Sequence, residues 1–258
     1  MIRKNVIKER LKNGENVIGT FVKSTDTTTV EILGLCGYDF IIVDNEHTVM
    51  NKETLANILR VCDSTDMVSM VRIREISEAQ VRQAMDTGAL SIMVPMTSTK
   101  EDVEAVVAYT KYAPEGVRGY SASHRAAAYG FMDATEYAEI SNRETMVACY
   151  CETKGAMDNL DEMLAVPGLD IIFIGPFDLS QALGVTGNPG HPIVQEAIDL
   201  VVKKARAAGK AVGTIASDPA SAKALFDRGI QYVCMSSDIN MIAQLGRQYI
   251  KEINEIRG

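Results

Sequence analysis

Two carboxylates stand where apolar runs of the chain end. Glu152 closes the run MVACYCE (146–152), and Asp178 follows the run DIIFIGP (170–176). Two carboxylates that lie close together repel each other unless a cation or a shared proton joins them. With open coordination positions they form a hard oxygen site suited to Mg²⁺, Mn²⁺ or a similar ion. Glu152 and Asp178 are therefore candidate metal ligands, and spacing alone leaves open a surface role for either, or a helix N-cap for Asp178.

A histidine, an aspartate and an arginine belong to neighbouring apolar runs. His47 comes three residues after Asp44, and a carboxylate beside an imidazole raises its basicity, as a general base requires. The alternative for His47 is an ordinary surface residue. Arg72 lies within the apolar run VSMVRI, where a buried guanidinium needs an anionic partner. That partner is either a substrate carboxylate or enolate, or one of the protein's own carboxylates in a structural salt bridge.

The elements that must position these residues are eight short runs rich in β-branched residues, which alternate with helical patterns. Runs that are apolar throughout suit parallel strands covered on both faces. Strand–helix alternation indicates a parallel sheet, and eight units predict one closed (β/α)8 TIM barrel over 1–258, with its chemistry at the carboxyl ends of the strands. A doubly wound open sheet is the alternative. The expected strands are 17–23, 39–44, 67–73, 91–96, 146–152, 170–176, 211–217 and 230–237.

Charge and composition exclude several classes of function. The formal net charge is -8 with no long basic run, which argues against a nucleic-acid partner. No apolar run reaches the roughly 20 residues that span a bilayer, and the amino terminus has no secretory pattern, so we expect a soluble cytoplasmic protein.

The five cysteines include no C-x-x-C pair, which favours reduced thiols. The longest irregular stretch, 115–145, is expected to be a functional or mobile loop.

Six segments then occur in an order that resembles a known family. They are GYDFIIVDNEHT, VRI, MDTGALSIMVPM, KYAPEGVRGY, ETKGAMDNLDEMLAVPGLDIIFIGPFDLS and GNPGHP. The chain resembles the class II, metal-dependent 2-oxo-acid aldolases, which include 4-hydroxy-2-oxoheptanedioate aldolase and 2-dehydro-3-deoxyglucarate aldolase. The resemblance runs from about residue 17 to residue 240. It implies a barrel of the phosphoenolpyruvate/pyruvate type in which a divalent metal, Mg²⁺, Mn²⁺ or Co²⁺, binds pyruvate.

The resemblance also implies a role for each matching residue. Glu152 and Asp178 resemble the metal ligands, His47 paired with Asp44 resembles the catalytic histidine, and Arg72 resembles the arginine that stabilises the enolate. The chain departs from the family in having Tyr150 where a glutamine is usual and Phe177 where an alanine is usual. The residues expected to bind substrate are Arg72, Gly119, Ser121, Tyr150, Phe177 and Ile215.

The expected function is the reversible cleavage of 4-hydroxy-2-oxo acids to pyruvate and an aldehyde. A lyase of the same fold that acts on an acyl-CoA or another dicarboxylic acid is one alternative, and a non-catalytic binder of small 2-oxo acids is another. A Schiff-base aldolase needs a desolvated lysine at the mouth, and only Lys23 and Lys154 lie near strand ends.

The resemblance further suggests a homo-oligomer, a trimer or a hexamer, in which a C-terminal helix is exchanged. The segment after about residue 238 carries an apolar stripe that could pack on its own barrel or on a neighbour's. The stripe consists of Ile239, Ile242, Leu245, Ile250 and Ile253.

Overall fold

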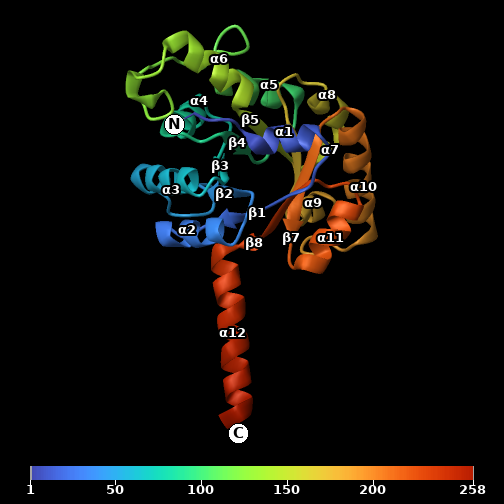
Figure 1. Ribbon diagram of the computed structural model, residues 1–258. Coiled ribbons are helices and arrows are strands. Elements are labelled where there is room, and N and C mark those ends of the chain that lie inside the picture. Colours follow the sequence, from blue (N-terminus) through green and yellow to red (C-terminus); the bar gives the residue numbers. More distant parts are fainter. Residues whose placement is uncertain (1, 258) are drawn as a thin grey trace.

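The computed structural model describes residues 2–257, in which the strands close into a parallel barrel (Figure 1). Each strand pairs with its neighbour in sequence, and β8 returns to β1 with Tyr232 opposite Val17. The predicted barrel is thus confirmed, and the β1–β8 pairing rules out the open sheet. The strands are β1 Val17–Val22, β2 Phe40–Asp44, β3 Val68–Arg72, β4 Ser91–Val94, β5 Met146–Cys151, β6 Ile171–Ile174, β7 Ala211–Ala216 and β8 Tyr232–Ser237.

Most helices surround the barrel, and many of them begin at side chains that cap them. The side chains of Asn51 and Ser77 accept hydrogen bonds from the backbone N–H groups of Thr54 and Gln80 in the first turns of α3 and α4, as N-caps do. The helices are α1 Val6–Lys12, α2 Thr27–Leu35, α3 Lys52–Ser64, α4 Glu78–Thr87, α5 Lys100–Thr110, α6 Ala134–Glu144, α7 Lys154–Asp158, α8 Leu160–Leu164, α9 Pro176–Ala182, α10 Pro192–Ala207, α11 Pro219–Asp227 and α12 Asp238–Arg257, with a 3-10 turn at Ala128–Gly130.

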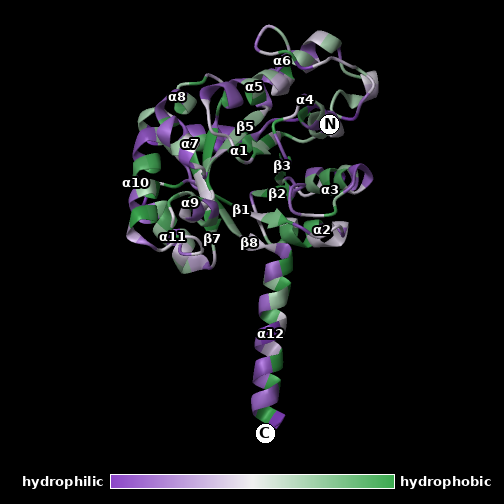
Figure 2. Cartoon of the chain, turned by 180° about the vertical axis from the view of Figure 1, so that it is seen from behind, coloured by the Kyte–Doolittle hydropathy of each residue, from purple (hydrophilic) through white to green (hydrophobic). Residues whose placement is uncertain are grey.

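The interior of the barrel is filled by aromatic rings that pack against glycines. The rings of Phe40 and Tyr232 stack with their centroids 3.8 Å apart. Gly19 and Gly213 lie beside these rings, because a Cβ atom at Gly19 would come within 2.3 Å of the Phe40 ring. Figure 2 shows the barrel strands as mainly hydrophobic, as expected of strands covered on both faces.

The amino-terminal end of the barrel is closed by a helix that the sequence patterns did not predict. Ile7 and Leu11 of α1 are buried in the same cluster as the interior residues Phe40, Met146 and Ala211. The amino end is therefore packed with apolar side chains, and polar groups gather at the carboxyl ends of the strands.

The long stretch 115–145 is more ordered than the sequence suggested. It contains the 3-10 turn and all of α6, so the irregular part is shorter than expected. Two ion pairs hold this part to the barrel: Arg118 Nη2 lies 2.6 Å from Asp86 Oδ1, and Arg125 Nη2 lies 2.6 Å from Asp63 Oδ2. Because the stretch joins α5 to β5, it lies at the amino ends of the strands, and Figure 1 shows it on the opposite side of the barrel from α12.

Helix α12 leaves the end of β8 and extends away from the barrel (Figure 1). Its apolar stripe is exposed: Ile242 and Ile250 retain 65% and 62% of their accessible surface. Packing of the stripe along its own barrel was one of the two expected arrangements, and the structure does not show it. In the described part of the chain, no helix has the length and apolarity needed to cross a membrane.

The glycine beside the stacked rings provides a test of this packing. Gly19→Ala should destabilise the protein by at least about 1–3 kcal/mol, the usual cost of overpacking a core, because the new Cβ would also lie 2.5 Å from the Phe40 carbonyl oxygen. Chemical denaturation measures the loss. Gly190→Ala is the control, since its Cβ would lie 3.8 Å from the nearest atom, and equal stability of the two variants would contradict the packing described.

Candidate active site at the carboxyl ends of the strands

The candidate site is built from the ends of β2, β3 and β5 and from the start of α9. Asp44 and Arg72 are the last residues of β2 and β3, and they face each other in the strand register. Glu152 directly follows β5, and Asp178 lies in the first turn of α9 after β6. The barrel thus brings the predicted carboxylates and the predicted arginine to one mouth.

Asp44 and Arg72 form a buried two-point ion pair. Arg72 Nε donates to Asp44 Oδ1 at 3.1 Å, and Arg72 Nη2 donates to Asp44 Oδ2 at 2.7 Å. Burial alone would raise the pKa of Asp44, but the hydrogen bonds and the charge of Arg72 outweigh it and lower that pKa. The two-point geometry fixes the plane of the guanidinium. The intramolecular salt bridge considered for Arg72 is therefore present in the protein.

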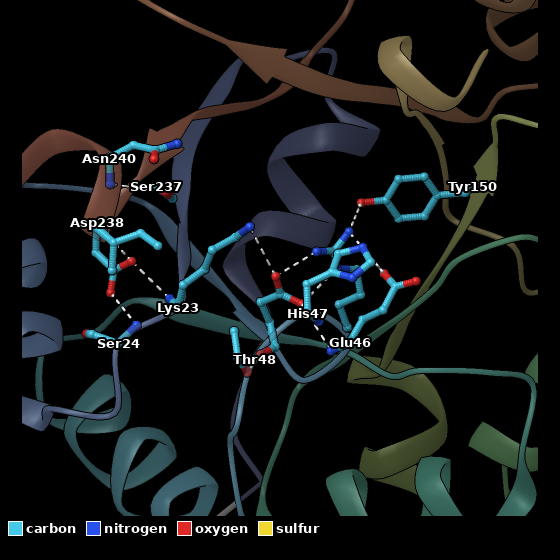
Figure 3. Close-up of polar contacts among 12 residues, drawn as sticks. Lys23, Ser24, Glu46, His47, Thr48, Tyr150, Ser237, Asp238 and Asn240 are labelled. Atoms are coloured by element: carbon cyan, nitrogen blue, oxygen red, sulfur yellow. Dashed lines mark hydrogen bonds and ion pairs between the residues drawn. The ribbon is translucent and has the colours of Figure 1, made fainter. Parts of the chain in front are cut away.

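The remaining nitrogen of Arg72 faces two further side chains. Nη1 donates to the Tyr150 hydroxyl at 3.2 Å and lies 3.1 Å from Glu46 Oε2. Figure 3 labels Tyr150 and Glu46, and dashed lines mark these two contacts with the same nitrogen. Burial raises the pKa of Tyr150 well above its ordinary value. It also raises the pKa of Glu46, although the charges of Arg72 and His47 oppose the shift.

His47 does not form the expected side-chain pair with Asp44. Asp44 Oδ1 accepts the backbone N–H groups of Glu46 and His47, at 3.0 and 3.1 Å. The imidazole Nε2 instead lies 3.4 Å from Glu46 Oε2, and the His47 side chain is 64% exposed. The carboxylate that can orient the imidazole is thus Glu46, because Asp44 is already committed to Arg72 and the loop backbone. Sequence reasoning assigned Glu46 no role, although it lies directly between Asp44 and His47.

Glu152 is a buried carboxylate with a fixed orientation. Its Oε1 accepts the backbone N–H of Met96 at 3.0 Å, and its Oε2 lies against Gly175, where a Cβ would come within 2.3 Å. Burial raises the pKa of Glu152 to about 7, and the negative charges of Asp178 and Glu46 add to that shift. A cation at this position would relieve the repulsion between the carboxylates.

Asp178 is not a helix cap. Gly175 is the N-cap of α9 and Pro176 is its first residue, so Asp178 lies inside the first turn with an exposed side chain. Among residues 2–257, no group of three or more His, Cys, Asp or Glu side chains is placed to enclose a metal. Two carboxylates with positions left for water and substrate are nevertheless a donor set that suits Mg²⁺, so Glu152 and Asp178 fit a divalent cation.

The carboxylate of Asp238 holds the turn that follows β1. Asp238, the first residue of α12, accepts the backbone N–H groups of Lys23 and Ser24, each at 2.9 Å (Figure 3). The Lys23 ammonium lies 3.5 Å from Asp44 Oδ2 and its side chain is partly exposed. Lys154 is exposed at the start of α7. Neither is the desolvated lysine that a Schiff-base mechanism requires.

The residues expected to bind substrate divide into two groups. Tyr150 is buried at the mouth, while Phe177 in α9 and Ile215 near the end of β7 are exposed. Gly119 and Ser121, by contrast, lie in the connection from α5 to β5, at the amino ends of the strands. Within one chain they therefore do not join the other site residues, which corrects the expectation that this stretch contributes to the same mouth.

Comparisons with known proteins agree with this arrangement. The family model described as HpcH/HpaI aldolase/citrate lyase matches residues 17–244. A 2-keto-3-deoxy-L-rhamnonate aldolase from Salmonella gallinarum is 38% identical over 235 residues, which is 91% of this chain and 87% of that protein.

Solved structures show the same likeness. An HpcH/HpaI aldolase/citrate lyase family protein from Burkholderia cenocepacia J2315 superposes with a TM-score of 0.92 at 29% identity, covering 97% of this chain and 100% of that one. Citrate synthase SbnG superposes with a TM-score of 0.88 at 26% identity, covering 98% and 99%. With its barrel confirmed and the family model matching nearly its whole length, the chain is a lyase that belongs to the HpcH/HpaI aldolase/citrate lyase family.

Proposed function

We propose that this lyase reversibly cleaves 4-hydroxy-2-oxo acids to pyruvate and an aldehyde through a pyruvate enolate. The observation that carries the proposal is the meeting of a buried guanidinium, that of Arg72, with the carboxylates Glu152 and Asp178 at one mouth. Carboxylates that a cation can bridge, beside a fixed positive group, suit a reaction in which negative charge develops on a keto oxygen.

Glu152 and Asp178 would hold the divalent metal, for which Mg²⁺, Mn²⁺ and Co²⁺ are the candidates. Aldolases of this family generally depend on such a metal. When bound, it would act as a Lewis acid that polarises the keto group of the 2-oxo acid. Gly175 supports this role, since the absence of a side chain there lets Glu152 Oε2 lie against the backbone.

His47 transfers the proton, and Glu46 orients the imidazole of His47. In the cleavage direction the imidazole takes the proton of the C4 hydroxyl, the C3–C4 bond breaks, and the aldehyde leaves. The pyruvate enolate then takes up a proton from the imidazolium at its methylene carbon, which becomes the methyl group. Because Glu46 Oε2 lies 3.4 Å from His47 Nε2, the carboxylate stabilises the imidazolium that forms.

A second candidate is condensation or cleavage of a different acid on the same fold, such as an acyl-CoA or another dicarboxylic acid. The likeness to citrate synthase SbnG over nearly the whole chain supports it. A screen for pyruvate release over 4-hydroxy-2-oxo acids, with and without added metal, separates the two. Release of pyruvate from no member of the panel, under any metal, would favour the second candidate.

The first prediction from these proposals concerns the metal ligands. Glu152→Gln and Asp178→Asn should each weaken Mg²⁺ or Mn²⁺ binding by about 10-fold or more in calorimetry, since even residues that only support a ligand often contribute that much. Glu162→Gln changes an exposed glutamate of α8 and should bind the metal normally. Unchanged metal affinity in both variants would contradict the assignment of Glu152 and Asp178 as metal ligands.

The second prediction separates Arg72 from His47. Arg72→Lys should slow the exchange of pyruvate methyl protons with deuterated water by about two to three decades, because a point ammonium does not replace a preorganised planar donor. His47→Ala should slow aldol cleavage more than methyl exchange. Proton NMR follows exchange, and Arg74→Lys, at an exposed arginine, is the control.

Thermal melts of the same variants decide whether Arg72 is only structural. Arg72→Lys keeps the charge but loses the two-point hydrogen bonding of the buried ion pair, so a lower melting temperature is expected in any case. A folded Arg72→Lys protein that exchanges at the wild-type rate would refute the role in enolate formation.

We also propose that the protein is a homo-oligomer, a trimer or a hexamer, in which the stripe on α12 packs on a neighbouring copy. The exposure of Ile242, Ile250 and the other stripe residues along a helix that leaves its own barrel supports this arrangement (Figure 1). Exposed apolar surface of this extent is unusual in a monomer.

The third prediction tests this assembly. Ile242→Asp combined with Ile253→Asp should lower the mass measured by light scattering, because both substitutions place charge in the apolar stripe. Gln244→Asp, at an exposed position of the same helix, adds the same charge outside the stripe and should leave the mass unchanged. A wild-type protein that is monomeric at micromolar concentration would rule the assembly out.

A further inference from the structure

The hydroxyl of Tyr150 has an uncommitted proton beside the buried guanidinium. A phenol can both accept and donate a hydrogen bond. Tyr150 Oη accepts from Arg72 Nη1 at 3.2 Å, and among residues 2–257 no protein acceptor takes its proton in return. A tyrosine hydroxyl keeps that proton at neutral pH. A buried donor without an acceptor is costly, so the hydroxyl is suited to a partner that arrives with the substrate.

Most of the N–H groups of the guanidinium already have partners in the protein. Nε and one N–H of Nη2 are held by Asp44, and Nη1 faces both Tyr150 Oη and Glu46 Oε2. Of the five N–H donors of an arginine, this leaves the second N–H of Nη2 for a direct contact. The Tyr150 hydroxyl is a second donor, which carries the effect of the charge onward while every one of these contacts is kept.

Tyr150 and Glu152 lie on the same face at the end of strand β5. The two residues are two apart at the end of β5, and in an extended chain residues with that spacing point to the same face. The ring is held in place by Phe173, with ring centroids 4.9 Å apart, and only 3% of the residue is exposed. A dashed line in Figure 3 marks the hydrogen bond of the Tyr150 hydroxyl, whose partner is Arg72 Nη1.

We propose that Tyr150 is a catalytic donor, whose hydroxyl accepts a hydrogen bond from Arg72 and donates one to the substrate oxygen that becomes the enolate oxygen. No proton is transferred in this step, and no bond of the tyrosine is made or broken. A donor that is itself hydrogen-bonded to a cation is polarised, which strengthens its own hydrogen bond. The inference rests on the proposed function and names a group through which the charge of Arg72 reaches the reaction.

The test uses variants that separate the hydroxyl from the ring. Tyr150→Phe keeps the packing against Phe173 and removes only the oxygen, so exchange of pyruvate methyl protons in the metal-loaded protein should slow by about 100-fold. Tyr150→Gln retains an acceptor for Arg72 and a donor for the substrate, and it should recover part of the rate. Tyr112→Phe is the matched control, since it removes a buried hydroxyl that bonds to Tyr137 Oη.

A double variant distinguishes a relay from two independent donors. If the charge of Arg72 acts through Tyr150, the Tyr150→Phe/Arg72→Lys protein should exchange about as slowly as Arg72→Lys alone, because the two side chains act as one unit. Full additivity of the two losses would overturn the relay. The apparent KM for pyruvate should change much less than the rate, which a purely structural role would not produce.

The remaining outcomes keep the two proposals apart. If the wild-type protein exchanges in a metal-dependent way and Tyr150→Phe exchanges equally fast, the donor role is wrong and the proposed function stands. If the wild-type protein exchanges no methyl protons under any metal, the proposed function fails and the donor role fails with it. A lower melting temperature of Tyr150→Phe with normal exchange would make the hydroxyl structural, and it would likewise overturn the inference.

Discussion

The buried ion pair between Asp44 and Arg72 is the interaction on which the mouth of the barrel depends. It joins the last residues of two adjacent strands, and the same carboxylate also accepts the backbone N–H groups of Glu46 and His47. One side chain therefore sets the plane of the guanidinium and the path of the loop that carries the histidine. Because both groups are removed from water, loss of either would leave an uncompensated charge, and the geometry of the mouth follows from keeping them together.

Charge is unevenly compensated around this pair. Asp44 neutralises Arg72, whereas Glu152, whose pKa is raised to about 7, shares the mouth with Asp178 and Glu46. The barrel thus holds several carboxylates close together without enough protein cations to balance them. Such a cluster is unfavourable in an isolated chain and becomes favourable when a divalent cation and an anionic substrate bind. The repulsion between the carboxylates therefore favours the binding of a cation and a substrate at this site.

The sequence predicted the barrel and the positions of the main site residues because both depend on strong local signals. Apolar runs mark the strands, and Asp44, Arg72 and Glu152 are recognisable as the polar residues at their ends. The partner of His47 could not be read in the same way. Spacing placed Asp44 beside it in the chain, but the competition for that carboxylate between Arg72 and the loop backbone is a tertiary effect that sequence spacing does not contain.

The helices show where sequence patterns lose information. The stretch 115–145 was expected to be irregular, although Asp133 caps α6 within it by accepting the backbone N–H groups of Thr135 and Glu136. The place of Gly119 could not be predicted from its motif, since within one chain a residue that precedes β5 lies at the other end of the barrel from the mouth. In α12 the apolar stripe was evident, but a stripe indicates that something covers it and not which surface does so.

The carboxylate of Asp238 joins the projecting helix α12 to the turn that follows β1 at the mouth of the barrel. This aspartate begins the projecting helix α12, yet its carboxylate holds the backbone at Lys23 and Ser24, from which the lysine side chain reaches toward Asp44. One carboxylate therefore fixes both the start of the projecting helix and the β1–α2 turn at the rim of the barrel. Any change in the direction in which α12 leaves the barrel would have to move this turn as well, or break the two hydrogen bonds that hold it.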